Sequence, residues 1–312
     1  MDIKMSKVTL AILAIVLSLL LVSCGGDKPT SSTQNQETLT SNAKIGVLVV
    51  SHGSHSKQWR KTLLDVGESA KPALVKGGKV ADVRTAYMEY EGPSIADQLR
   101  AFDEEGYSEV IIVPMFLTVS SHTADDIQNI VGIQSNPEVL ATLKEEEIQV
   151  YSPKAKVRIT PLLDFPGYLK KNVTRRYKAI SKNPGNEGVV LVAYGSEPYN
   201  QQWVELINDI GKYLKINAEV ENISYSWCGH IVRYAREPTT NAINQILEME
   251  QSAVVIPILV AVDEHFQGEI VLEGVQAVPN YEEKVIYKQD AILPDDNINQ
   301  WVVDIVNETI GG

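Results

Sequence analysis

The stretch Lys44-Ile-Gly-Val-Leu-Val-Val-Ser-His52-Gly53 decides the fold of this chain. Its apolar run, residues 45–50, is short and ends at a polar turn. This is typical of a strand that is buried on both faces, and so of a parallel sheet. After a second run of this kind, residues 110–117, and two further residues, the chain continues as Ser-Ser-His122. Ligands of open α/β sheets bind at the carboxyl ends of the strands. We therefore expect two imidazoles, each at the end of a strand, to lie over one crevice.

Around these strands the pattern alternates between strand and helix. Apolar residues at helical spacing predict one helix over about 57–75 and another that has Pro93 in its first turn and ends at Gly106. Alternation of this kind is typical of an α/β domain with a parallel sheet. The remaining predicted elements of this region are strands at 79–88, 109–117 and 155–161 and helices at 123–132, 136–146 and 165–181.

The same pattern then occurs a second time. Gly188-Val-Val-Leu-Val-Ala-Tyr194-Gly-Ser repeats Gly46-Val-Leu-Val-Val-Ser-His52-Gly-Ser at an offset of 142 residues, and His265 follows His122 at an offset of 143. Matching offsets over so long a stretch indicate a duplication. We predict two tandem α/β units, residues 44–181 and 187–312, joined by a turn-rich linker.

Residues 1–23 have the pattern of a signal peptide. Two lysines precede an apolar run that is too short for a comfortable membrane span. Leu21-Val-Ser-Cys24 resembles a bacterial lipobox, which implies cleavage before Cys24 and lipidation of its thiol. The expected product is an extracytoplasmic, membrane-anchored lipoprotein, on the periplasmic side or the cell surface, with residues 24–43 as a flexible tether. An uncleaved anchor or cleavage elsewhere are the alternatives.

Composition excludes some classes of function. The 312 residues are 44% apolar and carry a net charge of −12, and an acidic chain without a basic block argues against nucleic acid as a partner. If Cys24 carries lipid, Cys228 is the only other cysteine, so neither an internal disulfide nor a cysteine-based metal site is expected. Because the duplicated chain already holds both halves of a cleft, we expect a monomer.

Three motifs, in order, resemble the sirohydrochlorin chelatase family. They are SHGS at 51–54, YMEYEGPSI at 87–95 and VPMFLTVSSHTADDI at 113–127. In these stretches the chain is similar to the CbiX-like, ATP-independent cobalt, nickel or iron chelatases. The resemblance implies two flavodoxin-like (chelatase-fold) units. It also implies a lyase that inserts Co²⁺, or else Ni²⁺ or Fe²⁺, into a tetrapyrrole such as sirohydrochlorin, as in cobalamin biosynthesis. It further implies that His52, Glu89 and His122 form the metal and proton-transfer site.

The residue types suit this chemistry. Imidazole binds cobalt, nickel and iron well and is largely neutral near pH 7. Two imidazoles leave coordination positions open for the ring nitrogens, and a carboxylate such as Glu89 can accept the pyrrole protons. The metal is then a substrate, and no organic cofactor is expected. The alternative is a non-catalytic carrier lipoprotein for a metal, a tetrapyrrole or haem. Such a carrier needs no proton acceptor, so Glu89 favours the enzyme.

The second unit departs from the motif. Tyr194 replaces the first histidine and Tyr234 falls where Glu89 would be, so only His265 remains, beside Glu264. The simpler interpretation is a degenerate copy that forms the other wall of the cleft. In the other interpretation Tyr194, Glu264 and His265 form a second metal or haem site, since tyrosine and histidine are both axial haem ligands.

Two acidic residues follow the second histidine. Asp125 and Asp126 are most simply placed in the first turn of a helix, where carboxylates favour the helix dipole. A path by which metal enters is the alternative role for this pair.

Overall fold

The computed structural model describes residues 43–163 and 167–312. The predicted signal peptide, the lipobox with Cys24 and almost all of the tether lie outside the described residues. Within the two described ranges, no helix combines the length and apolar composition needed to cross a bilayer.

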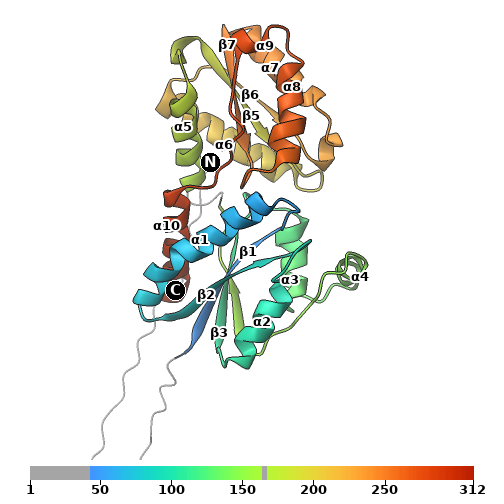
Figure 1. Cartoon of the computed structure of the whole chain (residues 1–312), viewed down its shortest axis with the longest axis vertical. Coiled ribbons are helices and arrows are strands. Elements are labelled where there is room, and N and C mark those ends of the chain that lie inside the picture. Colours follow the sequence, from blue (N-terminus) through green and yellow to red (C-terminus); the bar gives the residue numbers. More distant parts are fainter. Residues whose placement is uncertain (1–42, 164–166) are drawn as a thin grey trace, which may run out of the picture. The chain divides into compact units, whose positions relative to one another are not determined.

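The first sheet has four parallel strands in the order β2-β1-β3-β4 (Figure 1). The central strand β1 is buried along its whole length, which explains why its sequence is apolar without alternation. The strand order matches the first four strands of a flavodoxin-like sheet. The strands are β1 (Ile45–Ser51), β2 (Val80–Tyr87), β3 (Glu109–Pro114) and β4 (Lys156–Ile159).

Helices cover both faces of this sheet. They include α1 (Lys57–Lys76), α2 (Ile95–Glu104), α3 (Ile127–Ile130) and α4 (Pro137–Glu145). The helix predicted to have Pro93 in its first turn begins later, at Ile95, because Ser94 caps it by accepting a hydrogen bond from the Asp97 amide at 3.1 Å.

One predicted strand is shorter in the structure. The strand expected over 109–117 ends at Pro114, because Met115 makes a last backbone bond to Val50 (2.7 Å) before the chain leaves the sheet. The expectation that His122 ends a strand was therefore wrong. His122 is instead the first residue of a π-helix, η1 (His122–Asp126), which continues into α3.

The second sheet has the same design. Its four parallel strands follow the order β6-β5-β7-β8, which confirms the predicted α/β class with two tandem units. The strands are β5 (Glu187–Ala193), β6 (Ile223–Trp227), β7 (Ser252–Ile258) and β8 (Val285–Tyr287). The accompanying helical segments are η2 (Pro184–Asn186), α6 (Asn200–Ala218), η3 (His230–Val232), α7 (Glu237–Leu247), the π-helix η4 (Glu264–Val271), α8 (Leu272–Gln276) and α9 (Tyr281–Lys284).

Two helices cross between the halves. Helix α5 (Tyr168–Ile180) follows the first sheet in sequence but packs on α6 and β7, whereas α10 (Asp296–Gly311) follows the second sheet and packs on α1 and β3 (Figure 1). The Tyr168 hydroxyl donates to Asp304 at 2.7 Å, so the two helices also contact each other. The unit boundaries 44–181 and 187–312 stay a prediction from the repeat. The packing of α5 and α10 does not follow these boundaries, because each helix packs on the half to which it does not belong in sequence.

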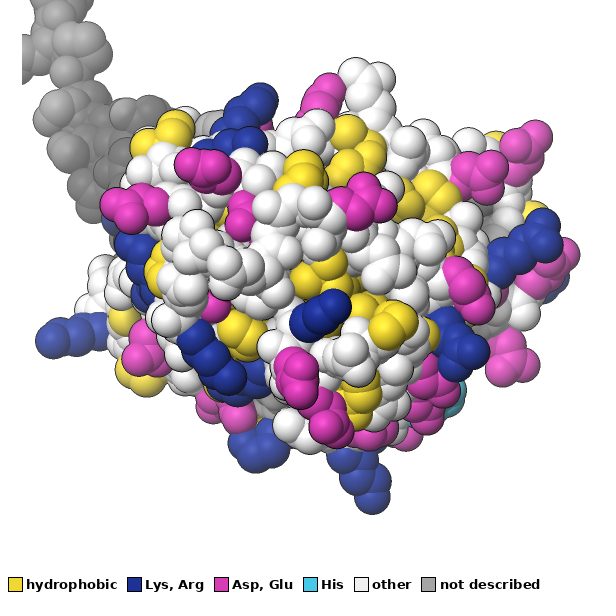
Figure 2. All heavy atoms as spheres, turned by 90° about the horizontal axis from the view of Figure 1, so that it is seen from above, with side chains coloured by type: hydrophobic (Ala, Val, Ile, Leu, Met, Phe, Trp, Pro, Cys, Tyr) yellow, Lys and Arg dark blue, Asp and Glu magenta, His cyan; other side chains and the backbone are white. Residues whose placement is uncertain are grey.

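One hydrophobic core runs through both halves. A single cluster joins Val47 and Val49 of β1, Leu191 of β5 and the fully buried Trp301 of α10, while the opposite face of each sheet has a core of its own. Residues 42–312 accordingly form one compact unit. On the face seen in Figure 2, acidic and basic side chains are intermixed, so that face alone would steer a charged ligand only weakly.

Candidate metal centre

The end of β1 and the loop after β2 hold His52 and Glu89 together. The amide of Glu89 donates to the His52 carbonyl at 2.9 Å, and Met88 donates to Ser51 at 3.0 Å. The ladder between the two strands thus continues past their ends. Gly53 permits this, because its φ is +104° and a Cβ there would lie 2.2 Å from the Glu89 carbonyl oxygen.

His122 reaches the same sheet edge from the start of η1. Its Nδ1 lies 2.9 Å from Asp126 Oδ2, one helical turn away. A carboxylate on one ring nitrogen fixes the orientation of an imidazole and leaves the other nitrogen, Nε2, for a metal. Single turns of π-helix are frequent at functional sites. Asp126 therefore holds the His122 ring in place. Of the two predicted acidic residues only Asp125 lies in the first turn of η1, whereas Asp126 is its last residue.

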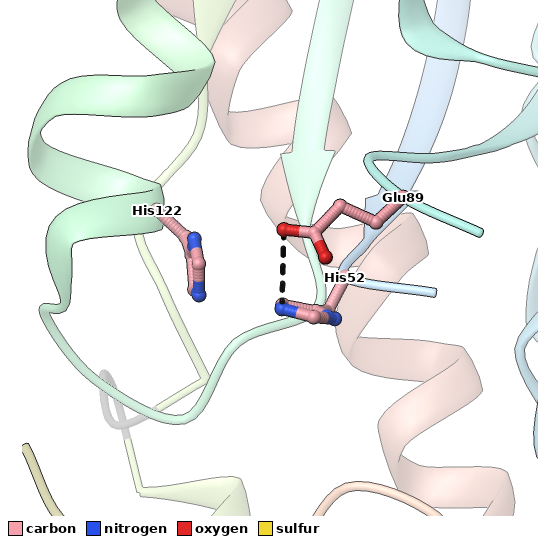
Figure 3. A group of neighbouring side chains, drawn as sticks. All are labelled: His52, Glu89 and His122. Carbon is pink, nitrogen blue, oxygen red and sulfur yellow. Dashed lines mark ion pairs between the residues drawn. The ribbon is translucent and has the colours of Figure 1, made fainter. Parts of the chain in front are cut away.

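The three predicted residues meet at one point (Figure 3). One ligand atom from each of His52, Glu89 and His122 lies within 4.8 Å of the other two, and the described part of the chain contains no other such group of three His, Cys, Asp or Glu residues. Nε2 of His52 is 3.6 Å from Oε1 of Glu89, and the two imidazole rings are edge to face with centroids 4.6 Å apart. The side chains of His52 and Glu89 are 31% and 17% exposed, so the site is open to small solutes.

The electrostatics favour a neutral imidazole. Burial, and next the neighbouring His122, lower the pKa of His52, while Glu89 acts in the opposite direction. His52 is then uncharged near pH 7 and can offer a lone pair to a metal. Burial together with Glu89 and Asp126 raises the pKa of Glu146, which shows that a further carboxyl group lies near the site.

The partner role of Asp126 is not part of the sequence-based expectation. The signal that could have found it is the His-x-x-x-Asp spacing, which places both side chains on one face of a helix. Asp125, its neighbour, instead accepts a hydrogen bond from the Tyr199 hydroxyl at 3.2 Å.

The second half has a related edge with different residues. The amides of Cys228 and Gly229 donate to Ala193 and Tyr194, at 2.9 and 3.0 Å, in the way that Met88 and Glu89 donate to Ser51 and His52. Tyr194 therefore occupies the position of His52, as predicted from the repeat. The assignment of Tyr234 to the Glu89 position was wrong: that position belongs to Gly229. Extra residues after β6 shift the offset that was counted along the sequence.

The candidate second site is only partly brought together. Tyr194 and His265 lie in one group of rings, linked through Phe266 with centroid distances of 5.6 and 5.3 Å. His265 pairs with Glu269 at 2.9 Å and its side chain is 55% exposed. Glu264 turns to lie over Gly268, where its carboxylate would collide with any added side chain. Metal or haem binding by Tyr194, Glu264 and His265 stays a prediction.

Known proteins are similar to this chain in sequence and in fold. Residues 46–180 match the sequence profile of the CbiX family. The sirohydrochlorin cobaltochelatase of Saccharolobus solfataricus is 26% identical over 110 residues, which are 35% of this chain and 81% of that protein. Two solved structures of SirB from Bacillus subtilis are similar, each over 85% of this chain and 95% of the other. The one with Fe³⁺ has a TM-score of 0.64 at 18% identity. The one from subspecies spizizenii in complex with cobalt has a TM-score of 0.59 at 17% identity.

The structural likeness establishes the fold. The matched range, residues 46–180, contains His52, Glu89 and His122. Through this range, which is less than half of the chain, the sequence is similar to the CbiX family.

Proposed function

We propose that this protein inserts a divalent metal ion into a tetrapyrrole such as sirohydrochlorin, without ATP, and that Co²⁺ is the first candidate metal, ahead of Ni²⁺ and Fe²⁺. The observation that carries the proposal is the convergence of His52, Glu89 and His122 within 4.8 Å. The name of the similar protein, a cobaltochelatase, and the cobalt or iron in the similar structures support the choice of metals.

In this proposal the two histidines bind the metal before insertion. Neutral imidazoles of His52 and His122 donate lone pairs, with His122 oriented by Asp126 at 2.9 Å. Two imidazoles and one carboxylate leave positions free for pyrrole nitrogens. Such an open set can also release its ion, which a closed cage of four protein ligands would not do.

Glu89 is proposed to handle the protons. Insertion exchanges one divalent ion for two pyrrole protons, so a base must stand beside the metal. The Glu89 carboxylate is 3.6 Å from the His52 ring nitrogen and is partly exposed. It can accept the protons one after the other and pass each to solvent. A carrier would not need this group, which is why the carrier alternative is less well supported.

We also propose that Cys24 is lipidated and that the protein works outside the cytoplasm, anchored to a membrane. The support is the sequence Leu-Val-Ser-Cys at 21–24 after an apolar run. A monomer is the proposed state, because both halves of the duplicated unit are present and are joined through α5 and α10.

The test is metal insertion by the full-length protein in mild detergent, followed by the absorbance of sirohydrochlorin after addition of Co²⁺. We expect His52→Ala and His122→Ala to abolish insertion and to weaken Co²⁺ binding, with the circular dichroism spectrum unchanged. Glu89→Gln should keep much of the Co²⁺ affinity but lower the rate by about 10²–10⁴-fold, as for the loss of a general base.

His265→Ala provides the matched control, because this histidine holds the corresponding place in the second half. Its Co²⁺ affinity should equal that of the wild type. If His265→Ala is inactive and His52→Ala is active, the site has been placed in the wrong half. If the wild type shows no turnover while His52→Ala loses metal, the protein is a carrier.

A further inference from the structure

Five aromatic rings gather at the edge of the second sheet that corresponds to the metal centre. Tyr194 follows β5, His230 and Tyr234 lie in the loop after β6, and His265 and Phe266 are the second and third residues of η4. Neighbouring ring centroids in this group are between 4.9 and 6.2 Å apart. These residues are called the ring cluster below.

The ring cluster is built differently from the metal centre of the first half. Burial raises the pKa of the Tyr194 phenol far above its ordinary value, and the hydrogen bond to Tyr234 adds to this effect. A phenol that stays protonated is a poor metal ligand. The position of Glu89 is held by Gly229, where a Cβ would lie 2.8 Å from the Tyr194 ring. The tyrosine ring thus occupies the space in which a carboxylate-bearing residue would stand.

Tyr234 is held in an uncommon conformation within this cluster. Both Arg233 and Tyr234 have left-handed backbone torsions, with φ of +52° and +59°, which is unfavourable for residues with a side chain. The Tyr234 hydroxyl lies 2.9 Å from the His230 ring nitrogens and 3.5 Å from the Tyr194 hydroxyl. The residue is nevertheless 36% exposed. Strain of this kind is typical of ligand sites.

Contacts between loops connect the ring cluster with the metal centre. The Ser54 hydroxyl donates to Asp263 at 2.7 Å, and these two residues lie next to the segments that carry His52 and His265. Tyr90, with a φ of +70° and 55% exposure, stands 5.8 Å from the His52 ring. The loops beside the metal centre and the ring cluster are therefore in contact, and an exposed tyrosine stands beside the metal centre.

We infer that the ring cluster binds the flat face of the conjugated macrocycle whose nitrogens receive the metal, with Tyr234 as the stacking residue. This inference rests on the proposed function. A planar π-system is the ligand that matches several rings and an exposed tyrosine held in place by two hydrogen bonds, since aromatic faces pair at the centroid distances found here. Arg233 is exposed and forms no ion pair within the described residues, so its guanidinium can pair with a carboxylate arm of the macrocycle.

The experiment measures binding of metal-free sirohydrochlorin to the full-length protein in detergent, through quenching of protein fluorescence and without added metal. We expect Tyr234→Ala to raise the dissociation constant about tenfold, and Tyr234→Phe, which keeps the ring, to stay within about twofold of the wild type. Tyr225→Ala is the matched control. It removes an exposed tyrosine of the same half, outside the ring cluster, and should leave the dissociation constant unchanged.

Co²⁺ affinity, measured separately, should be equal in the wild type and in Tyr234→Ala. The inference would be overturned if Tyr234→Ala bound sirohydrochlorin as tightly as the wild type. It would also be overturned if Tyr234→Phe lost as much sirohydrochlorin affinity as Tyr234→Ala, because the effect would then come from the hydroxyl and not from the ring. If Tyr234→Ala does not fold, the same binding measurement on His265→Ala decides instead. We expect its dissociation constant for sirohydrochlorin to be several times that of the wild type.

The inference and the proposed function fail in different ways. Insertion by the wild type, with unchanged KM and dissociation constant in Tyr234→Ala, would remove only the inference. Tight, Tyr234-dependent binding of the ring without any insertion would remove the proposed activity and leave the inference standing.

Discussion

Replacing Asp126 tests whether the metal centre depends on the orientation of His122. In the wild type the Asp126 carboxylate lies 2.9 Å from Nδ1 of His122, and its side chain is only 15% exposed. Asp126→Asn keeps an oxygen at this place but removes the charge. Asp126→Ala removes the hydrogen bond altogether and frees the imidazole to rotate away from the metal.

The expected size of the effect follows from the kind of hydrogen bond that is lost. A bond to a charged group contributes about 1.5–3 kcal/mol and a neutral one about 0.5–1.5 kcal/mol. The difference of about 1 kcal/mol corresponds to roughly five- to tenfold weaker Co²⁺ binding in Asp126→Asn. Asp126→Ala should approach a hundredfold, which is the upper end for loss of a residue that orients a ligand.

Isothermal titration of the apoprotein with Co²⁺ measures the effect, with Glu269→Gln as the matched control. Glu269 makes the same contact with His265, at 2.9 Å and one helical turn away, but both side chains are more than half exposed. Its replacement should leave Co²⁺ affinity unchanged. Wild-type affinity in Asp126→Ala, or an equal loss in Glu269→Gln, would refute the proposed role of Asp126.

Two further predictions concern pH and the N-terminal region. The pKa of His52 is lowered in the folded protein. As the pH falls, His52 is therefore protonated in the unfolded chain before it is protonated in the folded one. The free energy of unfolding of the apoprotein should therefore fall as the pH drops through about 6.5 toward the lower folded pKa. Denaturant titrations of the wild type and His52→Gln between about pH 7.5 and about pH 5.5 should show a weaker dependence in the variant, and equal dependence would contradict the prediction. Mass spectrometry of membrane-extracted protein should find an N-terminal, lipidated Cys24, whereas an unmodified peptide that contains both Ser23 and Cys24 would disprove the lipobox.

The sheets could be predicted from sequence because each central strand is buried on both faces. Such burial leaves an unbroken apolar run, as at 45–50, and the repeat then supplied the second sheet. Glu89 was predicted only from the resemblance to the chelatase family, and the structure brings it to His52 because both residues lie just past the ends of the neighbouring strands β2 and β1. For His122 the right sheet edge was predicted but the wrong local structure, because the chain leaves β3 early and returns as a π-helix.

Other features depend on information that a linear pattern does not contain. An amphipathic pattern shows that α5 and α10 bury one face, but not which sheet each face meets. Counting offsets along the chain placed Tyr234 opposite Glu89, because the count cannot locate the extra residues of a loop. Only the backbone bonds of Cys228 and Gly229 identify the true equivalent.

The exchange of α5 and α10 has a consequence for the order in which the chain folds during synthesis. The first sheet carries the metal centre, yet one of its covering helices is α10, and Arg158 of β4 bonds to the carbonyl of Thr309, 151 residues further along. Contacts so distant in sequence form late. A nascent chain that carries His52, Glu89 and His122 therefore remains incompletely folded until α10 has been made. For a protein with the proposed export signal, this delay keeps the first sheet from completing its fold before the whole chain has been synthesised.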